Sequence, residues 1–275
     1  MEFEDIISQY QDPVLIKQGG QKIVYRVIDP KYGNVALKIG SFSSDANLER
    51  IRREVMVLRD IDSIYFPKNY EFKVVPNRRF VILEEYIESI PLSGCFAKYQ
   101  DVKAALELIK HIIIALNVLW EKRVVHRDVK PDNILIPSSD IPKIIDLGIA
   151  RLLDLESLTR TAAMRGPCTP FYAAPEQLNN RKTEIDFRTD QFSIGIILMQ
   201  LLSKGQHPFD PAYVGGHSII QNIVEGNWNQ RILEDLEPKT LNPLVIRLLG
   251  TEPYERYRNP NDLIGDVNKI LEALP

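Results

Sequence analysis

The stretch "VVHRDVKPDNILIP", residues 124–137, is the most informative part of this chain, because it joins apolar ends to a charged middle. Its two valines and its closing "ILIP" predict two short buried strands. The loop between them carries six polar residues, four of them charged. Burying such groups without partners costs several kcal/mol each. We therefore expect the loop either to be exposed or to face something highly charged.

Length and composition bound the possible classes of protein. The chain has 275 residues, which allows one large domain or two smaller ones with a sizeable core. Its 44% hydrophobic and 26% charged residues are typical of a soluble globular protein. The net charge of -3 gives no general attraction to nucleic acid or to an anionic membrane. We therefore expect no nucleic-acid partner, and any site for a polyanion must be local.

The start of the chain, its cysteines and its apolar runs bear on location. The first residues, "MEFEDIISQY", are acidic where a signal peptide is basic, and Cys95 and Cys168 do not make a metal-ligand spacing. The longest apolar runs reach about half of the roughly 20 residues that a membrane span needs. We expect a reducing, cytoplasmic setting and no membrane span.

Two zones of the sequence differ in their secondary-structure pattern. Residues from about 10 to 86 alternate short β-rich runs with turn signals, interrupted by one helical stretch over 45–61, which predicts an antiparallel sheet with one helix. From about 100 onward the pattern is mostly helical, with Asp101 capping one helix and Thr189 opening another. The fold class is therefore α+β, with two lobes that we expect to touch along a cleft.

A set of polar residues points to magnesium and phosphate chemistry. Asp128, Lys130 and Asn133 lie on the opening loop, and Asp146 follows the next apolar strand. Two carboxylates and an amide at neighbouring strand ends suit Mg²⁺, which proteins hold with one or two carboxylates plus substrate phosphates. Each piece taken alone is an ordinary turn or surface loop. In this order and spacing, however, the residues predict a site for a metal-bound phosphate.

This ordered set resembles the signatures of protein kinases. The resemblance extends over roughly residues 10–270 and is closest to bacterial-type serine/threonine kinases. It implies a kinase domain over 10–275, with an N-lobe at about 10–86, a hinge at about 84–92 and a C-lobe at about 93–275. The matching pieces are "VALK" at 35–38, Glu54 on the following helix, "HRDVKPDN" at 126–133, "DLG" at 146–148, "AAPE" at 173–176, "TDQFSIGIIL" at 189–198, and Arg256 as the partner of Glu176.

The resemblance implies a role for each catalytic side chain. Lys38 holds the α- and β-phosphates of ATP and pairs with Glu54. Asp128 accepts the proton of the incoming hydroxyl, and Lys130 neutralises charge on the transferring group. Phosphoryl transfer of this kind requires mainly positioning and charge neutralisation from the protein.

The resemblance also implies the metal and nucleotide sites, with one departure from the family pattern. Asp146 and Asn133 hold Mg²⁺. In the phosphate loop, "KQGGQKIV" at 17–24, only one glycine matches the pattern. Either the adjacent glycines give enough flexibility while a lysine adds positive charge over the phosphates, or nucleotide binding is weakened; we favour the first. The expected ATP-binding residues are Gly19, Gly20, Lys22, Val24, Ala36, Lys38, Glu85, Ile87 and Leu135.

The strand before the hinge, "FVILEEYI", leaves one position open. Matching to the family puts Glu84 at the back of the adenine pocket, where a carboxylate is unusual and needs a partner or partial solvation. A shift of one residue puts Leu83 there instead.

The same resemblance implies a regulatory segment. Arg127 precedes Asp128, and an arginine there pairs with a phosphate on the activation segment. Thr159 and Thr161 are the expected phosphorylation sites. Thr169 is expected to hydrogen-bond near the catalytic residues, an arrangement typical of serine/threonine kinases.

We therefore expect ATP- and Mg²⁺-dependent phosphoryl transfer to serine or threonine of a protein substrate, with autophosphorylation of the activation segment. Two alternatives stay open. One is a catalytically weak pseudokinase that serves as a binding scaffold, and the other is a kinase-like phosphotransferase for small molecules. The particular substrate and the oligomeric state are not predicted by the sequence.

Overall fold

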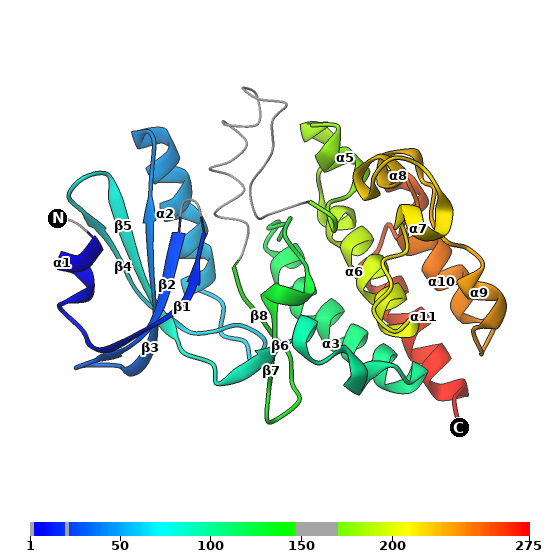
Figure 1. Ribbon diagram of the computed structural model, residues 1–275, viewed down its shortest axis with the longest axis horizontal. Coiled ribbons are helices and arrows are strands. Elements are labelled where there is room, and N and C mark those ends of the chain that lie inside the picture. The colour runs from blue at the N-terminus through cyan, green and yellow to red at the C-terminus, as the bar shows by residue number, and fades with distance from the viewer. Residues whose placement is uncertain (1–2, 20–21, 147–169) are drawn as a thin grey trace. The chain divides into compact units, whose positions relative to one another are not determined.

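The computed structural model describes residues 3–19, 22–146 and 170–275, and the chain divides into two compact units. The first contains the chain up to Glu88 together with Ile145 and Asp146, and the second contains Ser89–Ile144 and Pro170–Pro275. The first holds an antiparallel sheet with one main helix and the second is mostly helical (Figure 1). The predicted α+β class is confirmed.

The sheet of the first unit has five strands in the order β1-β2-β3-β5-β4, and every neighbouring pair is antiparallel. The turn between the second and third strands shows why the chain reverses there. Asp29 accepts hydrogen bonds from the backbone of Lys31 and Tyr32, and Gly33 adopts a φ of 72°. The strands are β1 (Gln11–Gln18), β2 (Lys22–Asp29), β3 (Gly33–Ser41), β4 (Asn69–Val75) and β5 (Arg79–Glu85).

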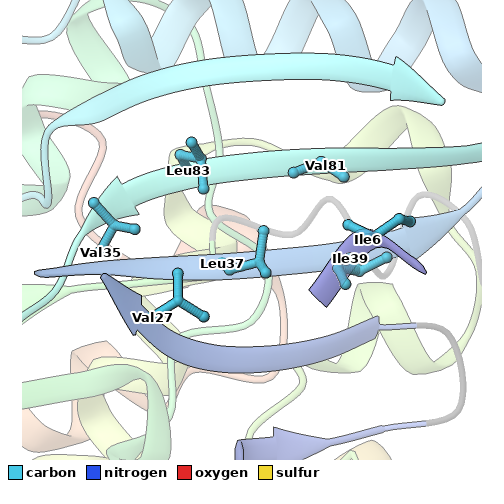
Figure 2. Close-up of a cluster of buried hydrophobic side chains, with 7 residues drawn as sticks. All are labelled: Ile6, Val27, Val35, Leu37, Ile39, Val81 and Leu83. Carbon is cyan, nitrogen blue, oxygen red and sulfur yellow. The ribbon is translucent and has the colours of Figure 1, made fainter. Parts of the chain in front are cut away.

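Each face of this sheet packs against a helix. Successive side chains of a strand point to opposite faces, so the apolar residues form two separate clusters. On one face Ile6 of α1 (Phe3–Ile7) is 2% exposed and packs on Val27, Val35, Leu37, Ile39, Val81 and Leu83 (Figure 2). On the other face α2 (Asp45–Arg59) contributes to a cluster of Phe42, Leu48, Ile51, Val55, Phe80 and Ile82.

The alternation also decides where charged residues of the strands lie. Lys38 and Glu84 fall on the α2 side of β3 and β5, because they alternate with the residues that pack on α1. Helix α1 has no counterpart among the elements predicted from the sequence.

The second unit combines a small sheet with helices. Its sheet has the strand order β6-β7-β8, with β6 at Ser89–Pro91, β7 at Ile134–Pro137 and β8 at Lys143–Ile144. Among the described residues no helix has the length and apolar character needed to cross a bilayer. The helices are α3 (Val102–Glu121), α5 (Pro175–Leu178), α6 (Phe187–Leu202), α7 (Pro211–Val214), α8 (Ile219–Glu225), α9 (Ile232–Asp235), α10 (Leu241–Leu248) and α11 (Pro260–Ala273), with short 3₁₀ turns at Leu92–Gly94, Phe96–Tyr99, Pro131–Asn133, Lys182–Glu184 and Pro253–Glu255.

One predicted helix start is confirmed and the other is wrong. The Asp101 side chain accepts hydrogen bonds from the first turn of α3, as expected for its cap. Helix α6 begins two residues before Thr189, because Asp186 caps it instead. The Thr189 hydroxyl donates to the Glu176 carboxylate at 2.8 Å, so it is already occupied by a tertiary contact.

A buried histidine in the second unit makes stability depend on pH. Nδ1 of His207 accepts a hydrogen bond from the Phe209 N–H, and Nε2 lies 3.1 Å from the Phe171 carbonyl oxygen, which fits a neutral ring. Burial lowers the pKa of His207 to about 4, although the Phe171 carbonyl and Asp210 act in the opposite direction.

We expect this histidine to weaken the fold in acid. In the unfolded chain the ring takes up a proton near its ordinary pKa of 6.5, but in the folded chain it does so only near pH 4. The stability it confers is therefore complete above pH 6.5 and is lost as the pH falls toward 4, by roughly 3 kcal/mol. Urea unfolding at several pH values should show this slope in the wild type and in His217→Gln, whose histidine is exposed. The same slope in His207→Gln would contradict the assignment.

Candidate active site

The stretch at 124–137 adopts one strand and not two. Its closing residues form β7, in which Ile134 and Ile136 are buried. Val124 and Val125 are half-buried and lie outside any strand, so the expected strand there is wrong. The loop between these ends is fixed instead by hydrogen bonds to the helices around it.

A buried carboxylate holds the start of this loop. Asp190 on α6 is fully buried and accepts hydrogen bonds from the backbone N–H groups of His126 at 2.9 Å and Arg127 at 2.8 Å. The indole N–H of Trp120 on α3 donates to the same carboxylate at 2.9 Å. Burial raises the pKa of Asp190, and these donors partly offset that effect. The hydrogen bonds to Asp190 stabilise the backbone of Arg127 at a φ of 64°, a conformation that residues other than glycine rarely adopt.

The loop presents Asp128 between two donors. Nζ of Lys130 and Nδ2 of Asn133 each lie 2.9 Å from the Asp128 Oδ2. The Asn133 amide also donates to the Asp128 carbonyl oxygen, and the Asp128 N–H donates to the His126 ring. The structure thus brings these three predicted residues together and orients the Asp128 carboxylate.

The Asn133 side chain has one buried oxygen that is unpaired among the described residues. Its side chain is 1% exposed, and within the described part of the chain Oδ1 has no hydrogen-bond partner. A buried, unpaired amide oxygen is costly unless something binds it. Oxygen is the donor that Mg²⁺ prefers, so this residue fits the predicted metal role.

The first unit holds a second group of predicted site residues, in which three side chains from one face of the sheet meet the side chain of Asp146. Nζ of Lys38 lies 2.5 Å from Glu84 Oε2 and 3.0 Å from Asp146 Oδ1. Nζ of Lys22 lies 2.6 Å from the same Asp146 oxygen. We call this the four-charge cluster: Lys22, Lys38, Glu84 and Asp146.

Burial and charge oppose each other in the four-charge cluster. Burial disfavours the charged form of Asp146, but attraction to both lysines outweighs it and holds the pKa of that carboxyl well below its usual range. Burial likewise opposes the charged Lys38, yet the two carboxylates raise its pKa. For Lys22 burial prevails over Asp146, and its pKa is lowered. The cluster contains two cations and two anions, and Lys22 is its most exposed side chain, at 19%.

The structure distinguishes Glu84 from Leu83, the two residues that the sequence left open for the back of the predicted adenine pocket. Glu84 lies opposite Ala36 in the sheet and its carboxylate pairs with Lys38, whereas Leu83 points into the α1-side core (Figure 2). The partner that a buried carboxylate needs is therefore Lys38, a pairing that the sequence did not suggest. The predicted partner of Lys38, Glu54, lies on α2, and its side chain is outside the described residues.

The other predicted nucleotide residues are partly placed. Val24 lies directly opposite Lys38 in the sheet, and Ala36 lies two residues before Lys38 on β3. Both side chains are therefore on the same face of the sheet as Lys38. The Gly19 N–H donates to the Lys22 carbonyl oxygen at 2.9 Å. Glu85 accepts from the Lys68 N–H, and Ile87 and Leu135 are half-buried. Gly20 and the regulatory residues Thr159, Thr161 and Thr169 lie outside the described residues.

The predicted pair of Glu176 and Arg256 is confirmed. Both side chains are 0% exposed, and the guanidinium binds both carboxylate oxygens, at 2.7 and 3.0 Å. The remaining guanidinium donors bind the carbonyl oxygens of Gly250, Thr251 and Arg188.

Gln177 is a further residue that the sequence did not reveal. Its side-chain amide donates to the Arg127 carbonyl oxygen and so connects α5 to the loop.

The donor set fits magnesium better than a metal held by protein alone. Among the residues that the structure describes, no group of three or more histidine, cysteine, aspartate or glutamate side chains could hold an ion. Mg²⁺ needs fewer protein ligands, because it binds phosphates and keeps several waters. Asp146 in the first unit, with both lysines on Oδ1, and Asn133 in the second unit, with Oδ1 unpaired among the described residues, are each candidates for the oxygen donors that we predict.

Comparison with known proteins agrees with this arrangement. A family model described as "Protein kinase domain" matches residues 10–263. The chain is 27% identical to a probable serine/threonine-protein kinase of Clostridium perfringens, over 96% of this chain and 38% of that protein. It is 26% identical to the serine/threonine-protein kinase PrkC of Bacillus subtilis, over 98% of this chain and 41% of that protein.

A third relative covers less of both chains. The chain is 31% identical to the serine/threonine-protein kinase PknB of Mycolicibacterium smegmatis, over 70% of this chain and 30% of that protein. The chain thus spans about two fifths of the length of the first two relatives. Because the family model covers most of it, the chain belongs to the protein kinase family.

Proposed function

We propose that this chain transfers the γ-phosphoryl group of ATP to serine or threonine hydroxyls of a protein substrate. The observation that carries the proposal is the Asp128 carboxylate, held by Lys130 and Asn133 in a loop that a buried aspartate fixes. A carboxylate oriented in this way suits an incoming hydroxyl. The relatives that bear serine/threonine-protein kinase names support the choice of acceptor.

Asp128 and Lys130 act on the acceptor and on the transferring group. Asp128 orients the hydroxyl and accepts its proton, because its carboxylate is partly exposed, at 24%, and is held at Oδ2 by Lys130 and Asn133. Lys130 lies 2.9 Å from that oxygen, and its ammonium also neutralises charge on the phosphoryl oxygens. The resemblance to kinases implies that the Thr169 hydroxyl also serves this step.

The two lysines and Asp146 of the four-charge cluster act on the nucleotide and its metal. Lys38 holds the α- and β-phosphates. Lys22 adds positive charge to the phosphate loop, which has fewer glycines than the family pattern. Magnesium, when bound, neutralises charge on the β- and γ-phosphates, and Asp146 and Asn133 would hold it. We expect Val24, Ala36, Ile87 and Leu135 to be the side chains that contact the adenine ring, together with the backbone at Glu85.

The setting and regulation of the reaction follow from its chemistry. A cytoplasmic location supplies ATP and Mg²⁺. Transfer to Thr159 or Thr161 adds negative charge to the segment that precedes α5, and Arg127 provides the pairing charge. Intact-mass measurement and peptide mapping after incubation with ATP test this part, since no added phosphate on the segment would exclude it.

The metal requirement tests the proposed reaction. Purified wild-type chain should transfer labelled γ-phosphate to a serine- and threonine-rich protein such as casein with Mg²⁺, and should stop on addition of EDTA. Asp146→Asn should lower transfer about 10²-fold or more, because it removes a charged oxygen ligand. Wild-type transfer that persists in excess EDTA, or that Asp146→Asn leaves unchanged, would contradict the assignment of this residue.

A further inference from the structure

Glu84 is the member of the four-charge cluster for which the proposed function gives no task. It is 8% exposed, and burying a carboxylate without a partner lowers the stability of the fold. Its partner is the Lys38 ammonium, 2.5 Å away. Strand β5 thus carries a buried acid on the face of the sheet that also holds the predicted nucleotide-binding residues Val24, Ala36 and Lys38.

The register of the sheet sets the relative position of these two side chains. Lys38 lies opposite Ile82, and Glu84 lies two residues farther along the same strand, so the two side chains are diagonal neighbours on one face. The β3–β5 register is regular from Val35 to Ser41, without a bulge. Glu84 therefore reaches Lys38 from the neighbouring strand of a continuous ladder.

The rest of the cluster would change its contacts if Asp146 engaged a bound metal. Both lysines now bind Asp146 Oδ1, the oxygen of a residue that would hold magnesium. Once Asp146 serves that role, Lys38 loses one of its two described anionic partners and keeps Glu84. A lysine side chain has several rotatable bonds, so one fixed partner decides where its ammonium lies.

We propose that Glu84 is a positioning residue for Lys38, which it holds in place for phosphoryl transfer while Asp146 engages the metal. This inference rests on the proposed function. It assigns to β5 a task that the sequence attributed to Glu54 on α2, and Glu84 acts through Lys38 without touching the nucleotide.

Charge and position can be separated with two variants of Glu84. Glu84→Gln and Glu84→Met both add one positive charge to a cluster that is otherwise neutral, so neither should weaken the binding of ATP. Glutamine keeps an oxygen that can accept from Lys38, whereas methionine has none. We expect kcat to fall about 10²-fold in Glu84→Met and about 10-fold in Glu84→Gln, since small displacements of a catalytic group have effects of this size.

Binding must be measured beside turnover. Calorimetry with Mg²⁺-free ATP should give an affinity equal to or several-fold tighter than that of the wild type, for both variants alike. Glu71→Gln is the matched control, because Glu71 and its ion-pair partner Lys73 both lie on β4, the strand next to β5, and their side chains are partly exposed. It should leave kcat, KM and ATP binding unchanged.

A third readout does not depend on turnover. The Nζ signal of Lys38, observed by NMR with a non-hydrolysable ATP analogue and Mg²⁺ and assigned with Lys38→Arg, should be retained in the wild type and Glu84→Gln and lost in Glu84→Met. Wild-type chain without transfer activity would refute the proposed function, and this signal would still decide the role of Glu84. Equal kcat values in wild type and Glu84→Met, an unchanged Lys38 signal, or a parallel loss of ATP binding and folding would overturn the inference.

Discussion

Replacing Asp128 by alanine should lower kcat for phosphoryl transfer about 10²–10⁴-fold, the range for loss of a positioned general base, while the Kd for ATP should stay nearly unchanged. In the proposed reaction the carboxylate acts on the acceptor hydroxyl, so its loss should affect the transition state and leave nucleotide binding intact. The substitution should not collapse the loop. The Asn133 amide keeps its bond to the backbone carbonyl oxygen of residue 128, and Asp190 still holds the residues before it.

A neighbouring aspartate provides the control for this experiment. Asp132 lies in the same loop, is exposed and accepts a hydrogen bond from the Ser93 hydroxyl at 2.6 Å. Steady-state kinetics of Asp132→Ala should match those of the wild type, and calorimetry should give the same Kd for ATP in all three proteins. Equal losses in Asp128→Ala and Asp132→Ala would show that the loop was disturbed and would remove the special role of Asp128.

The second large effect concerns stability. Arg256→Met should lower the free energy of unfolding by about 3–5 kcal/mol, because removing one partner of a buried ion pair leaves the other charge uncompensated. Glu176 is fully buried, and the same substitution strips donors from three carbonyl oxygens. Urea denaturation followed by circular dichroism measures the change.

Two further variants test the cause of that loss. Arg181 pairs with Glu252 at 2.7 Å, but both side chains are partly exposed, at 27% and 35%. Arg181→Met should therefore cost about 1 kcal/mol or less, as surface pairs do. Combining Arg256→Met with Glu176→Gln should recover part of the stability, since it removes the unpaired charge. An Arg256→Met variant as stable as Arg181→Met would contradict this account of the pair.

Much of the catalytic loop could be predicted because its residues are close in sequence. Asp128, Lys130 and Asn133 meet through contacts that span five residues or fewer. The paired valines at 124–125 gave a wrong strand, because β-rich sequence becomes a strand only where a partner strand is available. Thr189 and Asp186 are both good helix caps, and the choice between them depended on a contact with Glu176.

The parts that the sequence missed depend on contacts between distant segments. The ion pair of Lys38 and Glu84 requires the register of β3 against β5, which a shift of one residue would reverse. Helix α1 is too short for a periodic pattern, and its role is apparent only when Ile6 is seen on the sheet (Figure 2). The likeness to kinases identified the acids and the lysine individually but did not indicate that Lys38 and Glu84 form a pair.

The central claim is that the chain moves phosphate from ATP to a protein hydroxyl. The most direct measurement incubates wild type and Asp128→Ala with γ-labelled ATP, Mg²⁺ and a protein acceptor, hydrolyses the products and identifies the labelled amino acid. The account predicts phosphoserine or phosphothreonine with the wild type and almost none with the variant. Wild-type chain that binds ATP yet labels no hydroxyl amino acid, or labels only small molecules, would contradict it.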